Sequence, residues 1–135
     1  MPIVFVDTVA WIALVNTRDS LHDKAKEVFA RLRAQNYQFV TTEFVLLEFA
    51  NALSAPLFRK SASNFIEGLR NMSEVEIVAA SSDLFAKGFR LYQNRSDKEW
   101  SIVDCASFVV MEEKQIVEAF TSDHHFAQAG FTVLL

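Results

Sequence analysis

Four acidic residues stand in segments whose other residues are mostly apolar, and they are the first candidates for chemistry. Asp7 directly follows the run IVFV, and Glu48 lies within FVLLEFANAL. Asp104 lies within WSIVDCASFVVM, and Asp123 follows IVEAFTS. A carboxylate that is removed from water without a partner costs several kcal/mol or takes up a proton. Four such residues in one small protein therefore require something that neutralises them.

Each acid taken alone also has an ordinary structural explanation. Asp7 and Asp123 could cap the helices that follow them, because Asp is a preferred N-cap residue. Glu48 and Asp104 could lie on narrow solvated stripes of helices that are otherwise apolar. These explanations remain open for single residues, but they account less well for all four acids together.

A divalent cation would account for all four acids at once. Two unit charges about 4 Å apart repel by roughly 4 kcal/mol at an effective dielectric constant of about 20, so an uncompensated cluster would protonate or open. An all-carboxylate site in a chain with one Cys suits Mg²⁺ or Mn²⁺. Such an ion binds phosphate oxygens and activates water, so the chemistry indicated is hydrolysis of a phosphodiester.

The segments that must position these acids alternate between strands and helices. Short apolar runs predict strands at 3–6, 37–40, 75–78, 116–120 and 131–135. Helical patterns cover about 8–16, the segment after 19–20, 43–54, 60–71, 83–94 and 101–113, with a helical turn at 124–129. This alternation indicates an α/β fold with a mostly parallel sheet, in which sites form beyond the carboxyl ends of the strands.

Polar residues before several helical segments predict N-terminal caps. Ser20 and Asp23 have the spacing of a weak capping box, with Asp19 or Ser20 as the cap itself. The other expected caps are Thr41 or Thr42 for the third helix and Ser81 or Ser82 for the fifth. Each cap would fix where a helix starts, and hence where its acid lies.

Length and charge limit the classes of protein that this chain can represent. A chain of 135 residues suits one domain spanning residues 1–135. The net charge of −4 gives no basic footprint for nucleic acid, although a bound metal ion could supply local positive charge. The single cysteine excludes a disulfide framework within the chain. With no basic leader and no long apolar run, we expect a cytoplasmic protein without membrane contact.

The ordered set of acids resembles the PIN domain family, especially the VapC-type toxin ribonucleases of bacterial toxin–antitoxin pairs. The matching stretches are FVDTVAWIALVN, TTEFVLLEFANAL, WSIVDCASFVVMEEKQI and AFTSDHHFAQAGF, in the family's order. The family pattern is an Asp and a small hydroxyl residue after the first strand, a Glu in the third helix, an Asp in a late helix and an Asp after the fourth strand. Asp7 with Thr8, Glu48, Asp104 and Asp123 match this pattern position by position.

The resemblance implies a fold and an activity. The fold is a three-layer αβα sandwich with a five-stranded parallel sheet of order 3-2-1-4-5. The activity is Mg²⁺- or Mn²⁺-dependent cleavage of RNA, by a homodimer that a small antitoxin protein neutralises. Two alternatives within the family remain: an RNA-processing nuclease without a toxin role, and a catalytically silent binding module.

The resemblance also implies residue roles. The expected catalytic and metal-binding residues are Asp7, Glu48, Asp104 and Asp123. Thr8 would support the first Asp or a metal-bound water, and Ser122 could bond a ligand or cap the following turn. Asp97 is a candidate outer acid, although helix capping explains it as well. Arg95 and Lys98 are candidates for contact with RNA phosphates, against a default of solvated surface charge.

Two adjacent histidines follow the last acid. Adjacent residues of a helix or turn do not share a face, so we expect that His124 and His125 do not serve one metal ion together. His125 is expected to pack locally with Phe126 and to have no catalytic role.

Other enzymes whose first strand ends in Asp fit less well. Haloacid dehalogenase-type phosphotransferases need a second Asp two residues later, where this chain has Val9. A response-regulator receiver domain needs paired acids near the first strand and a late Lys, but Asp123 follows the fourth strand here. The chain has no Gly-rich loop for nucleotide phosphates.

Overall fold

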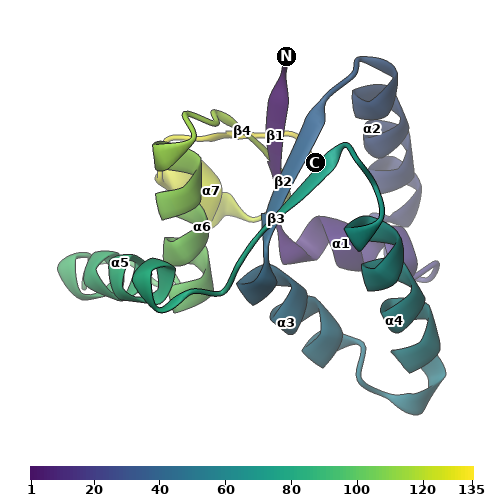
Figure 1. Ribbon diagram of the computed structural model, residues 1–135, viewed down its shortest axis with the longest axis horizontal. Helices are drawn as coiled ribbons and strands as arrows, with labels where there is room; N and C mark the ends of the chain where they lie inside the picture. The colour runs from purple at the N-terminus through teal and green to yellow at the C-terminus, as the bar shows by residue number, and fades with distance from the viewer.

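A parallel five-stranded sheet runs through the protein, whose computed structural model describes residues 1–135 (Figure 1). The strands are β1 (Ile3–Val6), β2 (Gln38–Thr42), β3 (Val75–Val78), β4 (Glu118–Phe120) and β5 (Thr132–Val133). Their order in the sheet is β3-β2-β1-β4-β5, and every neighbouring pair is parallel. The predicted strand order is therefore confirmed, and β1 and β4 lie side by side.

Seven helices cover the two faces of the sheet. They are α1 (Thr8–Val15), α2 (His22–Ala34), α3 (Glu43–Ala52), α4 (Pro56–Arg70), α5 (Ser82–Asn94), α6 (Ile102–Glu113) and α7 (His124–Gln128). Helices α1, α2 and α4 lie on one side, α5, α6 and α7 lie on the other, and α3 contacts both α1 and α6 (Figure 1). This is the three-layer αβα arrangement expected from the resemblance. No helix combines the length and apolar character that a membrane crossing requires.

The core fastens the helices to the sheet through aromatic side chains. Phe5 of β1 packs against Phe126 of α7, with ring centroids 6.2 Å apart. Phe108 of α6 meets the edge of Phe126 at 4.9 Å. On the other face, the Trp11 indole donates to the hydroxyl of Thr41 at 3.2 Å, and that hydroxyl donates to a β1 carbonyl. All of these side chains are buried, and only Phe108 keeps a small exposed area. This packing fixes the positions of the helices that carry the acids.

Several element boundaries differ from the prediction for local reasons. Helix α4 begins at Pro56, four residues early, because Pro is favoured in the first helical turn. The capping box of Ser20 and Asp23 does not form, since α2 begins at His22 and Asp19 accepts a bond from the Leu21 N–H instead. The predicted caps of Thr42 and Ser81 are both present. These differences leave the acids in place.

The contact between α5 and α6 depends on a glycine. A Cβ atom at Gly88 would lie 3.1 Å from the Cα and backbone N of Ala106, so the two backbones would have to separate. We expect Gly88→Ala to lower the free energy of unfolding by about 1–2 kcal/mol, because overpacking outweighs the better helix propensity of Ala. Urea denaturation measures this change.

Gly68 of α4 provides the matched control. A Cβ atom there would meet nothing within 4 Å, so Gly68→Ala should stabilise the protein by about 0.5–1 kcal/mol. If both variants changed the free energy of unfolding in the same direction, the close approach of α5 to α6 would not explain the need for glycine at position 88.

Candidate active site

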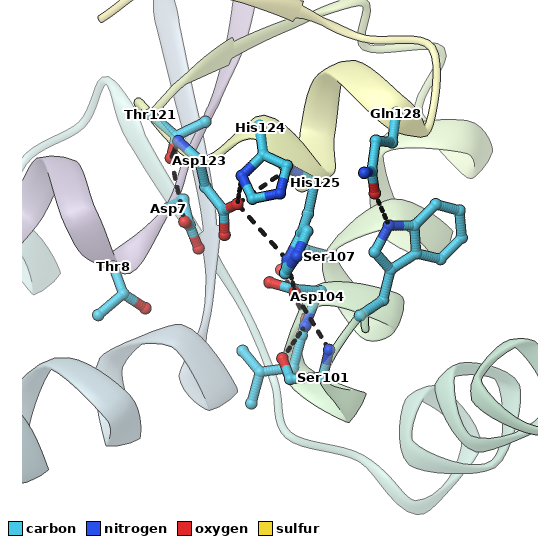
Figure 2. Close-up of polar contacts among 12 residues, drawn as sticks. Asp7, Thr8, Ser101, Asp104, Ser107, Thr121, Asp123, His124, His125 and Gln128 are labelled. Carbon is cyan, nitrogen blue, oxygen red and sulfur yellow. Dashed lines mark hydrogen bonds and ion pairs between the residues drawn. The ribbon is translucent and has the colours of Figure 1, made fainter. Parts of the chain in front are cut away.

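Asp7 and Asp123 meet at the carboxyl edge of the sheet because β1 and β4 are paired. Val6 lies opposite Phe120 in the register, so both chains leave the sheet together. The hydroxyl of Thr121 donates to Oδ2 of Asp7 at 3.1 Å and accepts from the backbone N–H of Asp123, also at 3.1 Å. Figure 2 shows the carboxylates of Asp7 and Asp123 next to each other beside this threonine. Thr121, which the sequence did not single out, thus links the first acid to the last.

Glu48 reaches the same edge from α3. The Thr42 side chain caps α3 at the end of β2, so this helix starts where the second strand stops. The hydroxyl of Thr8 donates to Oε1 of Glu48 at 2.6 Å. Thr8 therefore supports Glu48, whereas the expectation from the resemblance was support for Asp7 or for a metal-bound water.

Asp104 enters the site from the first turn of α6 and has two structural partners. It forms a capping box with Ser101: the Asp104 N–H donates to the Ser101 hydroxyl, and the Ser101 N–H donates to Oδ2 of Asp104 at 3.1 Å. Nδ1 of His125 lies 3.0 Å from the same oxygen. The side chain of Ser107 bonds the Val103 carbonyl instead, so the polar stripe that could have solvated Asp104 is not formed. Oδ1 has no partner in the protein and remains free for a ligand.

The two histidines both lie near Asp123, although we expected that adjacent residues of a helix or turn would not share a face. Asp123 caps α7 by accepting from the His125 N–H at 2.9 Å. This places Nδ1 of His125 3.5 Å and Nδ1 of His124 3.8 Å from Oδ1 of Asp123. Both rings lie beside the Asp123 carboxylate in Figure 2. At the first positions of a short helix, the rings fold back over the cap, so the rule for helix faces does not apply.

Burial and mutual repulsion set the ionisation of the first two acids. Burial, together with the charges of Asp104 and Glu48, raises the pKa of Asp7 to about 7, against the opposing effect of hydrogen bonds from the Thr8 backbone and the Thr121 side chain. Burial also raises the pKa of Glu48, with the charges of Asp104 and Asp123 acting in the same direction. These couplings connect all four carboxylates into one electrostatic group.

No cationic side chain of Lys or Arg neutralises this group. Every ion pair made by Lys or Arg involves other acids; Asp104 and Asp123 pair only with histidine, and Asp7 and Glu48 form no ion pair. The donor set is all oxygen, which is what Mg²⁺ and Mn²⁺ prefer. No three of the four acids bring oxygens within 4.8 Å of one another, so in this arrangement at most two could contact one ion directly and water would complete its coordination. The residues present thus fit a hydrated divalent cation.

The remaining candidates from the sequence lie elsewhere. Asp97 forms two bonds of 3.1 and 3.2 Å with the Arg95 guanidinium, and Lys98 lies 3.6 Å from the same carboxylate. Asp97 is therefore neither a helix cap nor a neighbour of the four acids. Ser122 is exposed and does not cap α7, because Asp123 does. Contact of Arg95 or Lys98 with RNA stays a prediction.

The comparison with family models decides the classification. The model of the PIN domain matches residues 4–132. This chain belongs to the PIN domain family. It is 30% identical over 128 residues to the "23S rRNA-specific endonuclease VapC20" of Mycobacterium tuberculosis, strains CDC 1551 / Oshkosh and H37Rv, covering 95% of each chain.

Solved PIN domain structures agree with the fold. The crystal structure of Mycobacterium tuberculosis VapC20, described as a "Sarcin-Ricin loop cleaving toxin", superposes with a TM-score of 0.82 at 31% identity over 96% of each chain. VapBC2 from Rickettsia felis, bound to promoter DNA, matches with a TM-score of 0.70 at 14% identity, over 98% of this chain and 97% of that one. Because its sequence identity is low, the similarity to VapBC2 shows only that the two proteins share a fold.

The raised pKa of Asp7 predicts a pH-dependent penalty in the metal-free PIN domain. Because its folded-state pKa is about 7 and its ordinary value is 3.8, stability is lost as pH rises from about 4 to about 7 and then levels off. We expect Asp7→Asn to raise the free energy of unfolding by about 1–3 kcal/mol at pH 8 and to have little effect near pH 4. Thermal unfolding in a chelator at several pH values measures this.

Asp97 gives a control of opposite sign. Arg95 lowers the pKa of Asp97 to about 2, so its charge favours the folded state and Asp97→Asn should not stabilise the protein. A loss of stability at pH 8 for Asp7→Asn would mean that the fold favours the ionised form, and that burial and repulsion do not raise the pKa of Asp7.

Proposed function

We propose that this PIN domain is an endoribonuclease that hydrolyses RNA phosphodiester bonds with Mg²⁺ or Mn²⁺ as its cofactor. The observation that carries the proposal is the convergence of four carboxylates, from β1, α3, α6 and the end of β4, with no Lys or Arg to balance them. A structural role would not require four acids at one edge. A cofactor that binds phosphate oxygens does require them.

The hydrogen bonds suggest which residues would bind the metal ion and which would orient them. Asp7, Glu48, Asp104 and Asp123 would hold the metal ion, which when bound polarises the phosphate and activates water. Three neighbours orient these ligands: Thr121 bonds Asp7, Thr8 bonds Glu48 and His125 bonds Asp104. Such outer contacts fix the direction in which each carboxylate presents its free oxygen.

The shape of the site suits a polymer. The edge of the sheet is partly open to solvent, since the side chains of Asp104 and Asp123 are 11% and 23% exposed while Asp7 lies buried behind them. An RNA strand can cross such an edge without threading. The negative charge of the chain makes the cation necessary for approach of a phosphate backbone.

The similarity to VapC20 over nearly the whole chain supports a toxin role. We propose that the protein is the toxin of a type II toxin–antitoxin pair, acts in the cytoplasm as a homodimer and is neutralised by a small antitoxin protein. Structured ribosomal RNA is the first substrate to test, because VapC20 is named for cleavage of 23S rRNA. Growth arrest on induced expression, relieved by co-expression of an adjacent gene, would separate the toxin from a processing nuclease.

Substitution of the acids tests the nuclease activity. We expect Asp7→Asn and Asp104→Asn to reduce Mn²⁺-dependent cleavage of ribosomal RNA by at least about 100-fold, since each removes a charged ligand. Mn²⁺ should raise the melting temperature of the wild type but not of Asp7→Asn. Gel analysis of RNA fragments and thermal unfolding provide the two measurements.

The stability of Asp104→Asn separates its two roles. The amide oxygen of Asn can still accept from the Ser101 N–H, so the capping box persists and the metal-free fold should be as stable as the wild type. A large loss of metal-free stability with retained cleavage would assign Asp104 to structure alone. Cleavage that survives both a chelator and the loss of Asp7 would rule out the metal-dependent mechanism.

A further inference from the structure

The three side chains at the start of α7 form a second, chemically different cluster at the rim of the acids. One ring nitrogen of His124, one of His125 and a carboxylate oxygen of Asp123 all lie within 4.8 Å of one another. No other group of three His, Cys, Asp or Glu side chains in the molecule is as close. The rings of the two histidines are also in contact, with centroids 4.5 Å apart. Metal binding by the carboxylate quartet does not require His124.

The distances are close to those that a zinc ion imposes. Zinc–nitrogen and zinc–oxygen bonds of about 2.0–2.1 Å in a tetrahedron place neighbouring ligand atoms roughly 3.3–3.4 Å apart. The separations from Oδ1 of Asp123 are 3.5 Å to His125 and 3.8 Å to His124. Small side-chain rotations would therefore complete three ligand positions. A water molecule would supply the fourth, because Asp104 does not belong to this close group.

The chemistry of the donors distinguishes this cluster from the carboxylate quartet. Two imidazole nitrogens with a carboxylate favour Zn²⁺, whereas carboxylates alone favour Mg²⁺ or Mn²⁺. The side chain of His124 is 74% exposed, so an ion from solvent can reach its nitrogen directly. The partly buried His125 and Asp123 lie behind it and would complete the site.

We propose that Asp123, His124 and His125 form a zinc-binding site, and that Zn²⁺ there inhibits the nuclease. The inhibitory part rests on the proposed function, because Asp123 would belong to both metal sites. Zinc would also take Nδ1 of His125 away from Asp104 and release the proton of that nitrogen to solvent. The catalytic cation would lose one ligand and the orientation of another, so Zn²⁺ and Mn²⁺ would compete.

Direct zinc binding tests the site without RNA. The metal-free full-length protein is titrated with Zn²⁺ in competition with a chromophoric chelator, in the absence of Mg²⁺ and Mn²⁺. The wild type should bind one Zn²⁺, and His124→Ala should weaken that affinity by about tenfold or more, since one of three protein ligands is lost. Equal affinity in the wild type and His124→Ala would overturn the proposal.

The third histidine of the chain supplies a matched control. His22 lies on α2, where its ring bonds the Ala13 carbonyl, and it does not contact the cluster. His22→Ala removes the same side chain and should leave zinc affinity within about twofold of the wild type. A similar loss of affinity in both variants would indicate nonspecific binding to histidine and would overturn the site.

Cleavage assays then connect the site to activity. His124→Ala should retain Mn²⁺-dependent cleavage and should need about tenfold more Zn²⁺ for half-inhibition, in step with its lost affinity. Equal zinc inhibition of both proteins would overturn the inhibitory role. If the wild type binds zinc through His124 but cleaves no RNA, the site stands and the proposed nuclease function fails instead.

Discussion

The parallel pairing of β1 with β4 is the constraint on which the rest of the structure depends. It brings the ends of two strands that lie more than a hundred residues apart in the chain to one edge of the sheet, with Val6 opposite Phe120. Asp7 and Asp123 follow these ends, and Thr121 bonds to both residues. With any other strand between β1 and β4, the two acids would be separated by at least one strand spacing of about 4.8 Å more.

The scaffold holds these acids against their mutual repulsion. Burial, together with neighbouring negative charge, raises the pKa of Asp7 and Glu48, so in the metal-free protein this edge of the sheet is destabilising at neutral pH. The aromatic contacts that fasten α6 and α7 to β1 offset this penalty. The core thus stabilises the fold, and the clustered acids destabilise it. A bound cation would remove this destabilisation.

Structural and functional roles coincide in this site. Asp104 belongs to a capping box, and Asp123 caps α7, yet both also face the other acids. A cap occupies one carboxylate oxygen and leaves the other free, so capping and metal binding are compatible within a single side chain. For Asp123 the sequence posed these two explanations as alternatives, and the geometry allows both together; the capping role of Asp104 was not predicted.

The sequence by itself determined which residues are acidic within apolar segments, how strands and helices alternate, and hence the α/β class and the four candidate ligands. These features depend on local pattern: β-branched runs, helical spacing and the position of each acid after a strand. Only the tertiary structure decided that Thr8 bonds Glu48, that Thr121 joins Asp7 to Asp123, and that the histidines fold back onto the acids. These contacts link residues up to 114 positions apart, and their geometry depends on strand register and helix packing, which local pattern does not encode.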